Sequence, residues 1–286
     1  MTDPTRADLI VIEGDGGMKE RAAAIPRLVA HYAGAFPWTP LAMLPFTYDM
    51  RDNRLCQALS GRVAPVFLFC RDLYSFNMLR RERGLPPNCV VGLDHCTAFH
   101  LKSSSWVDDF RNVESRHVLV VDRLDAESRQ TGPWRRLIHH GKAWFSPRLP
   151  KTVKKFSYPK VATLLGQMHS EYRESCIALM EQYTRAARAY PILAKDISLP
   201  NVCSFDDFCH IIAGSAAVFT TRLHVGVLSA MVGRPTFLFE GNNHKIRGIY
   251  EHSMVDWPHV RLVTTEEPIK LQSASSMKAG FSSKGA

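Results

Sequence analysis

Arg222, His224, Lys245 and Arg247 stand at the ends of apolar segments in the stretch VFTTRLHVGVLSAMVGRPTFLFEGNNHKIRGIY. Arg222 offers a planar fork of N–H donors that suits a carboxylate, while Lys245 offers phosphate a point charge. His224 carries an imidazole, which exchanges a proton near neutral pH. Together with Arg247, these residue types predict a site for a small ligand that carries both phosphate and carboxylate.

The elements expected around these residues place them at one edge of a sheet. AAVFTT predicts a strand, LHVGVLSAMVG a helix and RPTFLFE the next strand, joined by a right-handed crossover. The N-terminus of the helix presents unpaired N–H groups and the positive end of its dipole, which favour an anion. Lys245 and Arg247 follow the second strand, so we expect all four side chains to converge. Taken singly, an arginine or a histidine at a helix start is more often a surface residue or a capping partner.

Strand and helix patterns alternate along the chain. DLIVIEG, PLAMLPF, APVFLFC and NCVVGL predict strands in the first part, and RHVLVVDRLDAE opens a second series. This alternation predicts an α/β fold with parallel sheets covered on both faces. We expect one α/β lobe over residues 1–115, a second over 116–272 and a flexible tail over 273–286.

Composition narrows the class of protein. The chain has 286 residues, of which 45% are hydrophobic, so it can bury a substantial core and is not disordered as a whole. No apolar run is long enough for a membrane helix, and the opening MTDPTRADLIVIEG lacks the order of a secretory signal. The seven cysteines are irregularly spaced, which favours a reduced compartment. We therefore expect a cytoplasmic protein, and no metal-ligand spacing is evident.

The net charge of +9 comes from one segment. Residues 129–160 hold nine Lys and Arg and no Asp or Glu, so the rest of the chain holds 36 − 9 = 27 basic residues against 27 acidic ones. A basic segment with aromatic residues suits anionic lipid headgroups, an acidic glycan or nucleic acid; the alternative is a solvated loop without a dedicated partner. No nucleic-acid-binding module accompanies it, so we expect no nucleic acid.

The motifs resemble those of the polysaccharide pyruvyl transferase family. TTRLHVGVLSAMVGRPTFLFEGNNHKIRGIYEHS resembles the family's s/t-R-L-H-g segment, apolar helix, g-x-P strand and K-i-r-g sequence. LIVIEGDGG, FLFCRDLYSFNMLR and VVGLDHCTAFHL resemble three further family segments, in the same order. The resemblance runs from Asp8 to His252, except for the basic segment.

The resemblance implies a glycosyltransferase-B-like fold of two Rossmann-type lobes. It also implies that pyruvate passes from phosphoenolpyruvate to two sugar hydroxyls as a ketal, with His224 as general acid and with Arg222 and Arg71 holding the donor. Charge and placement add Lys245 and Arg247 to the donor contacts, whereas a salt bridge to Asp72 is the alternative for Arg71. The resemblance implies no cofactor besides the donor substrate. Weaker candidates for contact with the acceptor follow other predicted strands: Gly16, Gly17, Ser75, Asp94 and Glu240.

The chain departs from the family pattern at its start. Members usually begin with a further strand and helix before the glycine-cluster strand, so the first lobe looks shortened here, and Asp15 interrupts the cluster GDGG. A basic loop at 129–160 suits a lipid-linked or anionic glycan at the inner membrane face.

Two other functions stay open at this point. A nucleotide-sugar-dependent glycosyltransferase would share the fold, although no G-x-G-x-x-G follows the first strand. A non-catalytic glycan-binding subunit would need no donor chemistry.

Overall fold

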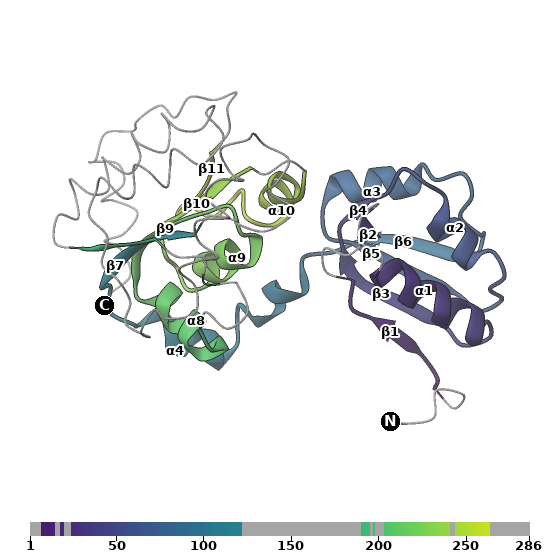
Figure 1. Cartoon of the computed structure of the whole chain (residues 1–286), viewed down its shortest axis with the longest axis horizontal. Coiled ribbons are helices and arrows are strands. Elements are labelled where there is room, and N and C mark those ends of the chain that lie inside the picture. The colour runs from purple at the N-terminus through teal and green to yellow at the C-terminus, as the bar shows by residue number, and fades with distance from the viewer. Residues whose placement is uncertain are drawn as a thin grey trace, which may run out of the picture. The chain divides into compact units, whose positions relative to one another are not determined.

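The computed structural model describes residues 7–14, 18–19, 24–121, 190–194, 197, 203–240 and 244–263 (Figure 1). The basic segment 129–160 and the tail 273–286 lie outside these residues. The chain divides into two compact units. Unit 1 comprises Met1–His100 and Gly248–Ser253, and unit 2 comprises Leu101–Arg247 and Met254–Ala286. Residues 101–115, which we expected in the first lobe, thus group with unit 2.

Unit 1 contains a 4-stranded sheet in the order β1-β3-β5-β6, in which all neighbouring strands are parallel. Its strands are β1 (Ile10–Ile12), β3 (Leu41–Phe46), β5 (Val66–Cys70) and β6 (Cys89–Leu93). A separate parallel pair is formed by β2 (Met18–Lys19) and β4 (Tyr48–Asp49). The helices are α1 (Ala24–Ala35), α2 (Arg54–Leu59) and α3 (Leu73–Arg80), followed by the short 3₁₀ helix η2 (Thr97–Leu101).

Unit 2 contains a 5-stranded sheet in the order β11-β10-β9-β7-β8, again with parallel neighbours. Its strands are β7 (His117–Val121), β8 (Ile192–Ala194), β9 (Ser215–Thr220), β10 (Thr236–Phe239) and β11 (Val260–Val263). The described helices are α4 (Ser105–Arg111), α8 (Phe205–Ala213), α9 (Leu223–Met231) and α10 (Lys245–Ser253), the last of which continues from unit 2 into unit 1. The predicted α/β class with parallel sheets is confirmed.

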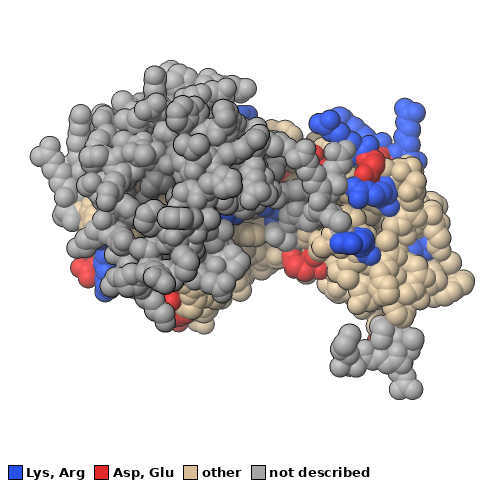
Figure 2. All heavy atoms as spheres, in the orientation of Figure 1, with Lys and Arg blue, Asp and Glu red and all other residues tan. Residues whose placement is uncertain are grey.

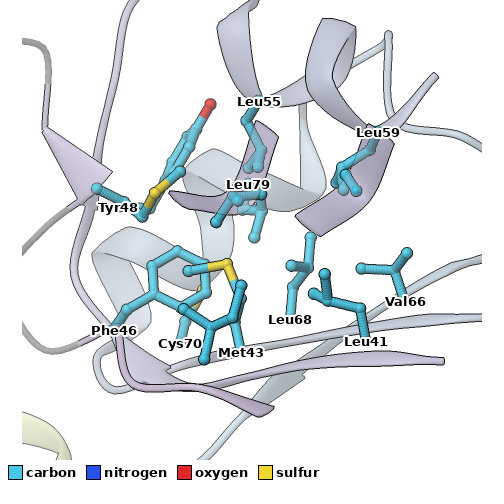
Figure 3. Close-up of a cluster of buried hydrophobic side chains, with 14 of the residues drawn as sticks. Leu41, Met43, Phe46, Tyr48, Leu55, Leu59, Val66, Leu68, Cys70 and Leu79 are labelled. Carbon is cyan, nitrogen blue, oxygen red and sulfur yellow. The ribbon is translucent and has the colours of Figure 1, made fainter. Parts of the chain in front are cut away.

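The core of unit 1 lies between its sheet and its helices (Figure 3). Along β3 the side chains of Leu41 and Met43 are fully buried, while Ala42 between them is only partly buried, as the two-residue period of a strand requires. Leu55 and Leu59 of α2 bury their side chains in the same cluster. Burial of each such leucine stabilises the fold by about 1.5–3 kcal/mol.

Basic side chains gather over α3 on the face of unit 1 drawn in Figure 2. The end of this helix carries Arg80, and Arg81 and Arg83 follow it. Cations at this position complement the negative end of the helix dipole and the last carbonyl groups. This charge therefore has a local structural explanation.

Gly226 sets how closely α9 approaches the sheet of unit 2. A Cβ atom at this position would lie 2.2 Å from Cδ2 of Leu238 in β10 and 3.6 Å from Cγ2 of Thr220 in β9. Leu238 is fully buried, so it has little room to withdraw. The helix can pack at this distance only because glycine has no side chain.

We expect Gly226→Ala to lower the free energy of unfolding by about 1–3 kcal/mol, because an added methyl group overpacks the helix–sheet contact. Gly34 is the matched control, since a Cβ atom there meets nothing within 4 Å and the residue lies inside α1. Gly34→Ala should raise stability by roughly 0.5–1 kcal/mol, because alanine favours helix. Urea denaturation of both variants tests this, and equal stability of the Gly226 variant and the parent would contradict it.

Candidate functional site

The N-terminus of α9 differs in its capping from those of α3, α4 and α8. Asp72, Ser104 and Ser204 cap α3, α4 and α8 with side-chain oxygens that accept a backbone N–H. Arg222 occupies the N-cap position of α9 and makes no side-chain cap hydrogen bond. Its backbone N–H donates instead to Thr220 Oγ1 at 2.9 Å. The first turn of α9 thus lacks the oxygen that would compete with an anionic ligand.

His224 is the one exposed residue of α9. The other residues of this 9-residue helix are buried, because α9 is apolar on nearly all sides and packs within unit 2. Solvent therefore reaches this helix at a single imidazole, in its first turn and two residues after Arg222. An exposed histidine contributes nothing to the core, so its position favours a role in binding or proton transfer.

Glu240 and Arg247 form an ion pair within unit 2. Both Nε and Nη2 of Arg247 donate to the carboxylate of Glu240, the second at 3.1 Å. Their side chains are 15% and 29% exposed respectively, so the pair is largely shielded from water. We expected Arg247 to bind the donor and Glu240 to contact the acceptor; the structure shows the two side chains paired with each other, and both ligand contacts stay predictions. This pair ties the first turn of α10, which begins at Lys245, to the end of β10.

Arg71 lies at the end of β5 in unit 1 and is fully buried. Its Nε donates to Thr47 Oγ1 at 2.8 Å, and its Nη1 lies 3.9 Å from Cys96 Sγ. Its backbone N–H donates to the carbonyl of Phe46 at 3.1 Å, which extends the pairing of β5 with β3. The guanidinium is thus held beside the carboxyl ends of the strands by residues that the sequence analysis did not single out.

Ser75 belongs to a buried network around the start of α3. Its hydroxyl donates to Asp72 Oδ2 at 2.8 Å and accepts the backbone N–H of Tyr48 at 2.9 Å. Asp72 Oδ1 accepts the backbone N–H of Ser75 at 2.8 Å. Ser75 was a weak candidate for acceptor contact, but these bonds make it a link between β4 and α3.

Asp94 follows β6 and joins a cluster of imidazoles in unit 1. Its Oδ1 accepts the backbone N–H of His95 at 2.7 Å, and its Oδ2 lies 4.0 Å from His100 Nε2. The ring of His95 stacks on that of His252 with centroids 4.7 Å apart, and His95 Nδ1 lies 2.9 Å from Ser253 Oγ. Sequence analysis missed His252 and Ser253, which follow the K-I-R-G motif on the same helix.

Gly248 explains how the end of α10 packs so closely in unit 1. A Cβ atom at this position would lie 2.9 Å from Cβ of Asp72 and 3.0 Å from its Oδ1. Gly248 and His252 are four residues apart, so they lie on one face of the helix. This spacing is the signal that would have indicated that His252 faces the same side as the motif glycine.

Burial lowers the pKa of His252, and the neighbouring His95 lowers it further. A hydrogen bond to the backbone of Asp94 and the carboxylates of Asp72 and Asp94 oppose this effect. These are the groups that face the ring. Since the pKa falls below the ordinary histidine value, the neutral imidazole is the form that this packing favours.

The remaining two candidates, Gly16 and Gly17, fall outside the described residues, so their proposed acceptor contacts stay predictions. Arg71, Ser75 and Asp94 lie in unit 1, whereas Arg222, His224, Glu240, Lys245 and Arg247 lie in unit 2. The structure brings Glu240 together with Arg247 in unit 2, and Asp94 together with the imidazole cluster in unit 1.

The described part of the chain contains no group of three or more His, Cys, Asp or Glu residues that could hold a metal ion. Among the described helices, none is long and apolar enough to cross a bilayer.

We expect acid to destabilise the protein partly through His252. Its pKa is lowered in the folded state, so the unfolded state binds a proton first and stability falls as pH drops below ~6.5. His252→Phe keeps an aromatic ring against His95 but cannot be protonated. Urea denaturation at about pH 7.5 and about pH 5.5 should therefore show a smaller loss in this variant than in the parent. His117 and His259 are partly buried and their pKa values are also lowered, so they contribute the same loss of stability in both proteins. An unchanged loss in the variant would refute the role of His252.

The chain is similar to known proteins in its fold and in its sequence. A structure of a functionally uncharacterized protein from Klebsiella pneumoniae subsp. pneumoniae NTUH-K2044 matches with a TM-score of 0.54 and 14% identity, over 91% of this chain and 76% of that one. This likeness concerns the fold. No curated protein matches the chain. The model of the family described as polysaccharide pyruvyl transferase matches residues 27–243, which is most of the sequence. The chain therefore belongs to the polysaccharide pyruvyl transferase family and is a transferase enzyme.

Proposed function

We propose that this enzyme moves pyruvate from phosphoenolpyruvate to two hydroxyls of a sugar in an exopolysaccharide, a capsule or a lipid-linked glycan. The observation that carries this proposal is the start of α9, where an exposed imidazole stands two residues after Arg222 on an otherwise buried helix. Family membership supplies pyruvyl transfer to a polysaccharide. Phosphoenolpyruvate is the donor that such a cationic helix terminus suits, because it carries both a phosphate and a carboxylate.

His224 supplies the proton that starts the reaction in this proposal. Protonation of the methylene carbon of phosphoenolpyruvate leaves an oxocarbenium-like centre at C2. One sugar hydroxyl attacks C2 and loses its proton, the C2–O bond to phosphate breaks, and the second hydroxyl closes the ketal as it loses its own proton. The products are the ketal and inorganic phosphate. An acid whose pKa lies near neutrality suits the first step, and histidine is the usual choice.

Arg222 and Lys245 hold the donor in this proposal. Arg222 lies at the N-cap of α9, where its fork can engage the carboxylate beside the N–H groups of the first turn. Lys245, at the start of α10, offers charge to phosphate as it departs. Arg71 is fully buried, with its Nε donating to Thr47 and its Nη1 beside Cys96, and it stays a predicted donor contact. We assign Arg247 to holding α10 through Glu240.

We further propose the glycosyltransferase-B-like organisation of two Rossmann-type lobes. The parallel sheets of units 1 and 2 support this. The proposed enzyme is cytoplasmic and uses no cofactor besides its donor substrate. Its basic segment 129–160 meets anionic headgroups or glycan at the inner membrane face, a proposal that the charge of nine Lys and Arg supports.

We expect His224→Ala to lower kcat for pyruvyl transfer about 10²–10⁴-fold, the usual contribution of a positioned proton donor. Stability should not change, because the side chain is exposed. The assay follows phosphate release and the mass gain of a glycan incubated with phosphoenolpyruvate. His31→Ala, which removes an exposed histidine from α1, is the control and should retain full activity. A fully active His224→Ala enzyme would remove the acid assignment.

We expect Arg222→Lys to raise the Kd for phosphoenolpyruvate about tenfold, because a two-pronged contact becomes a point contact. Thermal-shift titration measures this, since a ligand that binds the folded state raises Tm. Arg80→Lys, at the end of α3, should leave the shift unchanged. Stabilisation by a nucleotide-sugar and not by phosphoenolpyruvate would instead indicate a glycosyltransferase.

A further inference from the structure

An aromatic cluster lies on α4 and α8 of unit 2. The ring of Phe205 lies nearly parallel to that of Trp106, with centroids 6.0 Å apart and planes 5° apart. Phe208 continues the series at 6.2 Å from Phe205 and 16° from its plane. Phe110 meets Trp106 edge-on at 5.2 Å. Both helices thus contribute rings with similar orientation, and we call Trp106, Phe205 and Phe208 the aromatic strip.

The aromatic strip is open to solvent at Phe205. The apolar face of α8 runs through Phe205, Phe208, Cys209 and Ile212, and its last two members are fully buried. Phe205, by contrast, is 71% exposed. The core of unit 2 therefore does not need this ring. A large exposed aromatic residue stacked on a second one indicates a contact surface.

Acidic side chains border the aromatic strip. Asp206 directly follows Phe205, and its side chain is 78% exposed and lies 3.6 Å from His210 Nε2. Asp109, also exposed, lies one helical turn after Trp106. These carboxylates would repel anionic lipid or nucleic acid. They also accept hydrogen bonds from hydroxyl groups. The border thus favours a neutral partner that is rich in hydroxyls.

We propose that the aromatic strip binds a sugar unit of a neutral glycan chain, at a site separate from the start of α9. A pyranose ring presents an apolar C–H face that packs on an aromatic ring. The hydroxyls at its rim donate hydrogen bonds that carboxylates can accept. Phe205 and Trp106 supply the first kind of surface, and Asp206 and Asp109 supply the second. The inference rests on the proposed function only in its choice of a glycan, the class of acceptor that the family implies.

The aromatic strip would let the enzyme hold a polymer at one unit while it modifies another. Two linked contacts raise the effective concentration of the reacting unit, so long acceptors gain more than short ones. The strip therefore predicts a preference for polymeric acceptors, whereas a surface without a glycan site would give none.

Affinity electrophoresis of the full chain tests the proposal, in native gels that contain a neutral galactan, glucan or mannan. The parent should be retarded in at least one gel, and Phe205→Ala should weaken this binding about tenfold. Phe205→Tyr, which keeps an aromatic ring, should restore it. Trp38→Ala is the matched control, since Trp38 is 75% exposed in unit 1 and lies outside the strip. It should be retarded as the parent is.

Three results would overturn the proposal. The first is that the parent is not retarded in any gel, and the second is that Phe205→Ala is retarded as strongly as the parent. The third is that light scattering shows the parent to be a dimer and Phe205→Ala to be a monomer. The last would make the strip an interface between copies of this chain. The gels contain no phosphoenolpyruvate, so glycan binding is read independently of the transfer reaction. If His224→Ala loses transfer but is retarded as the parent is, both sites are supported. If His224→Ala stays active and is retarded as the parent is, only the assignment of His224 as the acid is refuted.

Discussion

The close packing of α9 against the sheet of unit 2 is the constraint on which the candidate site depends. Gly226 has no side chain where any Cβ atom would collide with buried Leu238. This approach buries the helix from Val225 to Met231 and leaves Arg222 and His224 at its open end. A helix so apolar cannot shift outward without exposing its core face, so hydrophobic burial of the helix holds the polar pair in place. The chemistry and the packing thus depend on the same short sequence.

Sequence reasoning worked where local pattern determines structure. Alternating apolar runs such as PLAMLPF and APVFLFC predicted β3 and β5, and their arrangement in parallel sheets followed from the helices between them. The start of α9 directly after β9 was predicted in the same way, so the sequence placed Arg222 at the beginning of this helix. The family follows from the same motifs, because their order and spacing are part of the fold.

Sequence reasoning did not find how charges pair across elements. The ion pair of Arg247 with Glu240 was not predicted. Ser75 looked open for an acceptor, although the start of α3 uses its hydroxyl internally. These side chains meet partners that the sequence alone does not place beside them, and the pairing depends on strand register and helix direction. Neither quantity can be read from the residue types, so a cationic residue at a sheet edge is weak evidence of binding until its partners are known.

The two ends of the motif helix α10 illustrate how one element serves two purposes. Its first turn is bound to β10 through Arg247 and Glu240, and its last turns pack on Asp72 and His95 through Gly248 and His252. A glycine is required because the buried carboxylate that caps α3 leaves no room for a side chain. The K-I-R-G sequence therefore serves packing at Gly248 and ion pairing at Arg247, besides the donor contact proposed for Lys245. The proposed chemistry therefore rests on Arg222 at the N-cap of α9 and on His224 in its first turn, the exposed residue of an otherwise buried helix.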